Sequence, residues 1–242
     1  MINNKKIIIV LPAYNAQATL KETFDRIPKN FADEIILVDD FSSDDTVKIS
    51  KELGIKTVCH NKNLGYGANQ KTCYTEALKN GADVIIMLHP DGQYKPELSI
   101  ELANKIVLDD YDCVLASRFL NNSAKFSKMP KYKYIANRFL TKLQNLIFGK
   151  NLSEYHTGYR AFSKRALETV NFKNYSNNFV FDNEILSDII GHNLKIGEIP
   201  CPCIYENVSS SINLKNSVIY GLGVLGVSIK YIIKHLNKQE IK

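Results

Sequence analysis

Short runs of consecutive apolar residues alternate with amphipathic, helix-like stretches over about the first 90 residues of the chain. The clearest runs are 6–11 (KIIIVL), 34–38 (EIILV) and 84–88 (VIIML), with a shorter one at 57–59. Strands that are apolar on both faces must be covered on both faces, and strands that alternate with helices pair in parallel. The chain is therefore expected to be an α/β protein, with a mostly parallel, Rossmann-like sheet covered by helices on both faces.

Polar side chains follow these runs at the points where the strands should end. They are Tyr14 and Asn15, Asp39 and Asp40, and His89, Asp91 and Gln93. In an open parallel sheet the ligand binds outside the carboxyl ends of the strands. We therefore expect these side chains to gather at one edge of the sheet and to bind a ligand there.

Asp91 is the best candidate for a metal ligand, with His89 and Gln93 alternating beside it on the same side of an extended segment. A nucleotide sugar leaves behind a diphosphate, and enzymes commonly neutralise its charge with Mg²⁺ or Mn²⁺ held by one or two carboxylates and the phosphates. Aspartate and histidine together suit Mn²⁺. Two simpler roles stay open: His89 as a structural loop residue, and Asp91 as a turn cap.

Asp39 and Asp40 are placed to accept hydrogen bonds from a ribose or a base, as acidic residues do at the equivalent strand end of dinucleotide-binding sheets. A turn or helix-capping role stays open for one of the pair. The turn at 63–67 (NLGYG) comes later, and its glycines, Gly65 and Gly67, would let the backbone approach a nucleotide.

The composition fits one globular domain in the cytoplasm. The net charge of +6 is modest and is not arranged in long runs, so we expect anionic small molecules or an anionic membrane surface as partners, and no nucleic acid. Five cysteines without framework spacing, and a start without a signal-peptide layout, favour the reducing cytosol. Without a Gly-x-Gly-x-x-Gly after the first strand, an oxidoreductase is disfavoured.

Six motifs, taken together and in order, resemble family 2 glycosyltransferases, in the branch similar to dolichyl-phosphate mannose synthase. They are 12–15 (PAYN), 38–40 (VDD), 63–67 (NLGYG), 91–93 (DGQ), 117–119 (SRF) and 157–160 (TGYR). The resemblance spans about residues 6–205. It implies the GT-A fold, an inverting hexosyltransferase, a UDP- or GDP-sugar donor, and a metal at the Asp-x-Asp position.

The resemblance also implies which residues hold the nucleotide. Pro12, Tyr14, Asp39 and Asp91 carry that role, and Asp91 and Gln93 would face the metal. With the strand ends and the glycine turn, the predicted nucleotide-binding set is Pro12, Ala13, Tyr14, Asn15, Asp39, Asp40, Asn63, Gly65, Gly67 and Asp91.

One position departs from the family pattern, because His89 stands where the family usually has the first Asp of Asp-x-Asp. The segment resembles the His-Pro-Asp-x-Gln-Tyr form of a bacterial and archaeal subgroup. The leading interpretation is an active glycosyltransferase of cell-surface glycan synthesis. The alternative is a catalytically impaired nucleotide-sugar-binding or scaffold protein with the same fold.

Two chemistries stay open on the acceptor side. If the acceptor is a polyprenyl phosphate, the attacking oxygen is already anionic and cations suffice to position it. Arg118, Arg160 and the lysines of a mobile basic loop at 121–133 could supply them.

A saccharide acceptor would instead need a base to take the proton of its hydroxyl group. Asp182 and Glu184 are the candidates for that catalytic role, with His156 as a weaker third. Asp182 could also simply cap the helix predicted at 183–191.

The chain is expected to divide into a GT-A glycosyltransferase domain at 1–210 and a helical extension at 211–242. Residues 217–233 are strongly apolar, but a membrane span needs about 20 apolar residues, and this run is shorter and contains Lys230. The extension is expected to pack on its own domain, to join a homo-oligomer, or to contact the inner face of the cell membrane peripherally.

Overall fold

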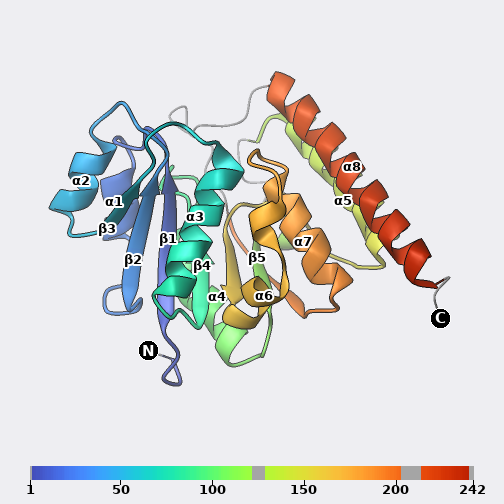
Figure 1. The fold of residues 1–242 in the computed structure, drawn as a ribbon, viewed down its shortest axis with the longest axis horizontal. Helices are drawn as coiled ribbons and strands as arrows, with labels where there is room; N and C mark the ends of the chain where they lie inside the picture. The colour runs from blue at the N-terminus through green and yellow to red at the C-terminus, as the bar shows by residue number, and fades with distance from the viewer. Residues whose placement is uncertain (1, 122–128, 203–213, 240–242) are drawn as a thin grey trace.

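A seven-stranded sheet forms the centre of the protein. A computed structural model describes residues 2–121, 129–202 and 214–239, and its strands follow the order β3-β2-β1-β4-β6-β5-β7 (Figure 1). The strands are β1 (Ile7–Ala13), β2 (Glu34–Asp39), β3 (Lys56–Cys59), β4 (Val84–Met87), β5 (Cys113–Ser117), β6 (Arg160–Ser163) and β7 (Ile196–Pro200).

Most neighbouring strands run parallel, as the sequence predicts; β6 is antiparallel to both β4 and β5. All seven residues of the central β1 are buried, which explains its unbroken apolar run. Because β1, β2 and β4 run in the same direction, their carboxyl ends meet at one edge of the sheet. The segments that follow Ala13, Asp39 and Met87 therefore come together there.

Helices cover both faces of the sheet, which confirms the predicted α/β architecture. One core lies between the sheet and α3, α6 and α7, around Tyr74 and Phe181, and the other lies between the sheet and α1 and α4, around Leu20 and Leu102. The helical segments are α1 (Leu20–Asp25), α2 (Thr46–Glu52), α3 (Tyr66–Lys79), η1 (Pro96–Leu98), α4 (Ser99–Val107), α5 (Lys131–Phe148), α6 (Lys164–Thr169), η3 (Phe172–Asn174), α7 (Phe181–Gly191) and α8 (Leu214–Gln239).

Two helix starts differ from the prediction. α5 begins at Lys131, directly after Pro130, so Lys131 and Lys133 belong to a helix and not to a basic loop. The other lysines predicted for that loop, Lys125 and Lys128, lie outside the described residues. α7 begins before residue 182, with Val180 at its N-cap, so the predicted capping role of Asp182 is wrong.

α8 runs along the flank of the domain beside α5 (Figure 1). The rings of Tyr231 on α8 and Phe148 on α5 meet at 4.6 Å between centroids, and a Cβ at Gly223 would lie 2.9 Å from Val180, beside α7. By length and composition alone, Asn216–Lys234 could cross a membrane. The domain boundary predicted at 210 falls in a segment outside the described residues.

Candidate active site

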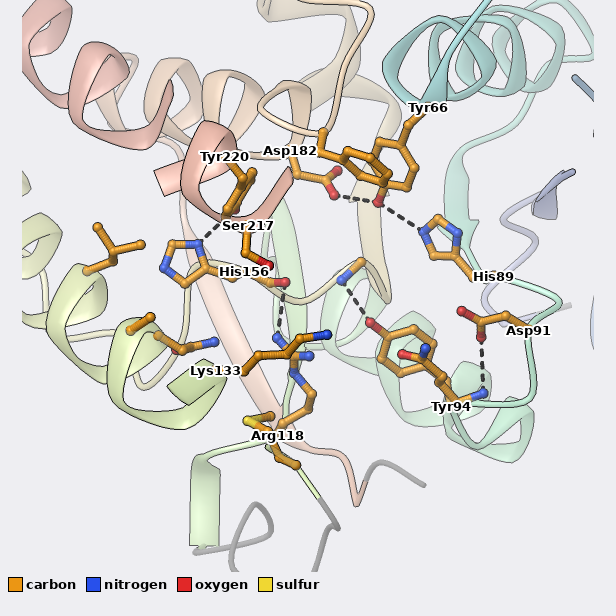
Figure 2. A pocket seen from close by; sticks show the side chains of 17 residues that line it. Tyr66, His89, Asp91, Tyr94, Arg118, Lys133, His156, Asp182, Ser217 and Tyr220 are labelled. Carbon is orange, nitrogen blue, oxygen red and sulfur yellow. Dashed lines mark hydrogen bonds between the residues drawn. The ribbon is translucent and has the colours of Figure 1, made fainter. Parts of the chain in front are cut away.

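Two cavities share a wall at the carboxyl edge of the sheet. The strand-end cavity, of about 420 Å³, follows the ends of β1 and β2 and the start of α3. The helix-side cavity, of about 240 Å³, extends towards α5, α7 and α8 (Figure 2). Tyr66, His89, Asp91 and Phe179 line both. A ligand in one cavity would therefore lie next to a ligand in the other.

Most of the residues predicted to bind the nucleotide do line the strand-end cavity. They are Pro12, Ala13, Tyr14, Asn15, Asp40, Asn63, Gly65 and Asp91. Asp39 and Gly67 do not line it, although Asp39 lies at the end of β2 as expected. The strand ends thus predict correctly where the cavity lies, but they do not predict which way every side chain points.

Asp39 and Asp40 are both committed to holding backbone turns. Asp40 accepts hydrogen bonds from the backbone N–H groups of Leu64 and Gly65, each at 2.9 Å, and contacts His60 Nδ1 at 2.7 Å. Asp39 accepts from the backbone N–H of Ser42 at 2.9 Å and from its hydroxyl group at 2.5 Å. Asp40 therefore forms part of the cavity wall, while Asp39 holds the turn that follows β2.

Gly65 and Gly67 make room for another loop of the protein. Gly65 has φ +98°, and a Cβ there would lie 2.7 Å from the carbonyl oxygen of Asn177; at Gly67 it would lie 2.4 Å from that of Ser176. Gly67 N–H donates to the Asn177 carbonyl at 2.8 Å. The close approach that these glycines allow is thus made by the loop before α7.

Asp91 is half-buried at the shared wall of the two cavities. Burial raises the pKa of its carboxyl group, and the nearby His89 and the backbone N–H of Gln93 only partly offset this. Oδ1 accepts from that N–H at 3.0 Å, while the second oxygen faces the cavity (Figure 2). An ionised carboxylate that is shielded from water is destabilised, and a cation beside it would stabilise it.

A divalent cation would fit this position, where Asp91 offers a carboxylate oxygen that faces the cavity. Within the described ranges, no group of three or more His, Cys, Asp and Glu side chains could hold a metal on its own. Mg²⁺ and similar ions are commonly bound by one or two carboxylates together with substrate phosphates and water. Gln93 lines the helix-side cavity beside Asp91 and offers a further polar group.

His89 is held in one orientation by Tyr66, which sequence analysis missed. The two rings stack at 5.4 Å between centroids, and Tyr66 Oη lies 3.2 Å from His89 Nε2. Tyr66 donates its single hydroxyl proton to Asp182 Oδ2 at 2.6 Å, so its oxygen accepts from His89 Nε2–H. Burial lowers the pKa of His89, which keeps the ring neutral. The hydrogen-bond network therefore leaves Nδ1 unprotonated and able to accept a hydrogen bond or bind a metal.

The structure brings one of the two predicted bases into the helix-side cavity. Asp182 lines it and accepts from Tyr66 and, at 3.0 Å, from Gln70 Nε2. Glu184 is not among the lining residues, and its Oε2 accepts from the backbone N–H of Ser176 at 2.6 Å. Glu184 therefore secures the loop before α7 and does not reach the place expected of a base.

Arg160 lies in the core and outside both cavities, unlike the predicted contact with an acceptor. It is 0% exposed and donates to three backbone carbonyl groups, those of Thr157 at 2.7 Å, Asp182 at 2.6 Å and Tyr155 at 3.0 Å. Burial opposes its charge, but the nearby Asp182 carboxylate helps to keep the pKa above its ordinary value. Arg160 therefore positions the segment that carries Asp182.

Arg118 lines the helix-side cavity and is fixed there by Glu154, a second residue that sequence analysis missed. Arg118 Nε donates to Glu154 Oε1 at 2.9 Å, and its backbone N–H donates to Oε2 at 2.8 Å. Lys133 of α5 reaches towards the same guanidinium group (Figure 2). Burial and the charge of Arg118 together lower the pKa of Lys133. Two cations thus converge in this cavity, as expected for a site that receives an anion.

His156, the third candidate base, packs against α8. Its Nδ1 lies 2.8 Å from the hydroxyl group of Tyr220, and burial lowers its pKa to about 3. The imidazole is therefore neutral near pH 7 and adds no charge to the cavity. Its contact with Tyr220 makes α8 part of the wall.

Replacing Gly158 with alanine is expected to lower activity by about 10- to 100-fold, as misplacing a reacting group by about 1 Å can do. A Cβ at Gly158 would lie 2.8 Å from His89 Nε2 and 3.3 Å from Tyr66 Oη, so His89 must move. The matched control is Gly221→Ala, where no atom lies within 4 Å. Steady-state kinetics would test this, and equal activities in the two variants would contradict the placement of His89.

Comparison with known proteins agrees with this geometry. The family described as glycosyl transferase family 2 matches residues 8–170. A UDP-N-acetylglucosamine–dolichyl-phosphate N-acetylglucosaminyltransferase from Methanococcus voltae is 30% identical over 223 residues, covering 85% of this chain and 88% of the relative. The low-salt glycan biosynthesis hexosyltransferase Agl6 of Haloferax volcanii is 28% identical, covering 79% of this chain and 46% of the relative.

A solved structure shares the fold. Glucosyl-3-phosphoglycerate synthase from Mycobacterium tuberculosis, in complex with Mn²⁺, UDP and glucosyl-3-phosphoglycerate, superimposes with a TM-score of 0.72 at 17% identity, covering 95% of this chain and 80% of that one. The family match spans the strand ends that build both cavities. The chain therefore belongs to glycosyl transferase family 2 and is a glycosyltransferase with the GT-A fold.

Proposed function

We propose that this enzyme transfers a sugar, with inversion, from a UDP- or GDP-linked donor to the phosphate of a polyprenyl phosphate in cell-surface glycan synthesis. The observation that carries the proposal is the convergence of Arg118 and Lys133 in a cavity that shares the Asp91 wall with the strand-end cavity. A phosphate held by these two cations would lie beside the sugar of the donor. Its oxygen is already anionic and needs no base.

The donor nucleotide would occupy the strand-end cavity, with its diphosphate towards Asp91. Tyr14 stands 55% exposed at this cavity and offers its ring to the base or ribose. The names of the two comparison proteins support a nucleotide-sugar donor, because one acts with UDP-N-acetylglucosamine and the other was solved with UDP and Mn²⁺.

Asp91 would hold the Mn²⁺ or Mg²⁺ ion, and His89 Nδ1 and Gln93 are the neighbouring polar groups. When bound, the cation would neutralise the charge that develops on the leaving nucleoside diphosphate. The residues of this chain orient the two substrates: Asp91 the diphosphate, and Arg118 and Lys133 the acceptor phosphate.

The state of Asp182 favours a phosphate over a saccharide acceptor. Its carboxylate already accepts hydrogen bonds from Tyr66 and Gln70. A sugar hydroxyl would have to reach one of the lone pairs that these two bonds leave free before Asp182 could take its proton. A phosphate acceptor makes no such demand.

Binding and product analysis together test the proposal. Titration calorimetry of UDP, GDP and dTDP, each with Mn²⁺ and again with excess chelator, should show metal-dependent binding of one nucleotide. The matching sugar donor, incubated with undecaprenyl phosphate, should then give a glycosyl phospholipid whose anomeric configuration is inverted. Transfer to a free saccharide, with none to the lipid phosphate, would contradict the proposed acceptor.

A further inference from the structure

α5 buries three polar residues besides Phe148, and it leaves four large apolar residues exposed. Asn137, Thr141 and Gln144 are buried, and Asn137 Nδ2 donates to Glu154 Oε1 at 2.9 Å. The opposite side repeats apolar residues at helical spacing, with Ile135 67% exposed. The exposed apolar residues of α5 are Tyr132, Ile135, Phe139 and Leu146. Internal hydrogen bonds explain the inner side, but nothing in the described part of the chain covers the outer one.

α8 presents a second apolar stripe to the outside. Val224, Val227 and Ser228 face the domain and are buried. The exposed apolar residues of α8 are Val218, Ile219, Leu222, Ile229, Ile232, Ile233 and Leu236. α5 and α8 lie side by side along one flank (Figure 1). Exposed apolar residues in such numbers on one flank are typical of a surface that binds something.

We propose that the outer sides of α5 and α8, here called the α5–α8 face, dock on an anionic lipid bilayer. The charges favour this occupant over a second copy of the chain. Neither 131–148 nor 214–239 contains an Asp or Glu, while Lys142 and Lys230 are exposed among the apolar residues. Two copies packed through this face would oppose cation to cation, whereas anionic headgroups complement it.

α8 lies on the bilayer surface and does not cross it, because contacts near both of its ends hold it to the domain. Tyr220 contacts His156 at 2.8 Å near the start of the helix. Lys234 pairs with Asp188 of α7 at 2.9 Å near its end. Crossing the membrane would break both contacts and remove Tyr220 from the helix-side cavity.

The same two helices connect the bilayer to the acceptor site. α5 contributes Lys133, Ala136 and Leu140 to the helix-side cavity, and α8 contributes Ser217 and Tyr220. This step rests on the proposed function: an acceptor with a phosphate head and a long apolar tail would place its head between these residues while the tail stays in the bilayer. The docked enzyme would thus bind the phosphate head of its acceptor without pulling the lipid out of the bilayer.

Flotation with vesicles tests the docking. The full chain should float with vesicles that contain phosphatidylglycerol, and less with pure phosphatidylcholine. The variant I135S/F139S/L146S should bind the vesicles at least about 10-fold more weakly, since each serine removes an apolar side chain that would enter the bilayer. The matched control, I100S/L108S, changes exposed apolar residues of and beside α4 and should float like the original chain.

The outcomes separate this proposal from the proposed function. Unchanged flotation of the triple variant would overturn the docking. If the original chain is a dimer, the triple variant a monomer, and both bind vesicles equally, the face joins two copies of the chain and the docking is likewise overturned. Transfer to a short, water-soluble prenyl phosphate should be equal in the triple variant and the original chain. If the original chain floats but glycosylates no prenyl phosphate, the acceptor assignment fails and the docking stands.

Discussion

Replacing Asp91 with asparagine is expected to lower kcat/KM by about 10²- to 10³-fold, the usual cost of removing one group that stabilises transition-state charge. Asparagine keeps the shape of the side chain and the oxygen that accepts from the Gln93 N–H. It removes the negative charge that would bind the divalent cation at the shared wall of the two cavities. Steady-state kinetics with saturating Mn²⁺, and calorimetry of nucleotide binding with and without chelator, would measure both losses.

The stability of the same variant separates a binding role from a structural one. Burial raises the pKa of Asp91, so folding favours the neutral carboxyl group and opposes the ionised one above the folded pKa. The D91N variant lacks this opposition and should melt at the same temperature or higher at about pH 7.5. Any gain should shrink as the pH falls through the raised folded pKa, and it should vanish below the ordinary pKa of the unfolded chain. Added Mn²⁺ and nucleotide should stabilise only the original chain; a variant that is less stable but remains active would contradict the assignment.

The features predicted correctly are those that local sequence determines. The strands buried on both faces have unbroken apolar runs, and the polar residues after β1 and β4 follow directly in the chain. Sequence alone therefore predicts that His89 and Asp91 lie at this edge, and both line the helix-side cavity. The helices could be identified in the same way where their apolar side faces the core.

The features that were missed depend on contacts between distant parts of the chain. Tyr66 and Asp182 are separated by 116 positions, and no periodicity links them. Arg160 is a residue type that often binds anionic substrates. Here backbone carbonyl groups from other parts of the fold bind its guanidinium group instead. The first turn of α5 is assigned to the basic loop because Lys131 and Lys133 add nothing to an apolar repeat, and a loop and an exposed helix turn share this composition.

Replacing Arg118 with methionine is expected to destabilise the protein by about 3–5 kcal/mol, the usual cost of leaving one partner of a buried ion pair behind. Glu154 is 0% exposed and would remain as an unpaired carboxylate. The double variant R118M/E154Q removes both charges and keeps an oxygen that can accept from Asn137 Nδ2. It should recover most of the lost stability in urea unfolding, but not the activity, because Arg118 would no longer bind the acceptor phosphate.

The pH dependence of the stability lost in R118M shows whether the loss comes from the charge of Glu154. Burial alone would raise the pKa of Glu154, but the charge and hydrogen bonds of Arg118 hold it below its ordinary value. In the original chain the pair therefore adds stability above the unfolded pKa, which is lost as the pH falls through the folded one. In R118M burial prevails and the pKa of Glu154 rises, so the deficit should be full at about pH 7.5 and smaller at about pH 4.5. A deficit that does not change with pH would mean that Arg118 stabilises the fold by packing and not by its charge.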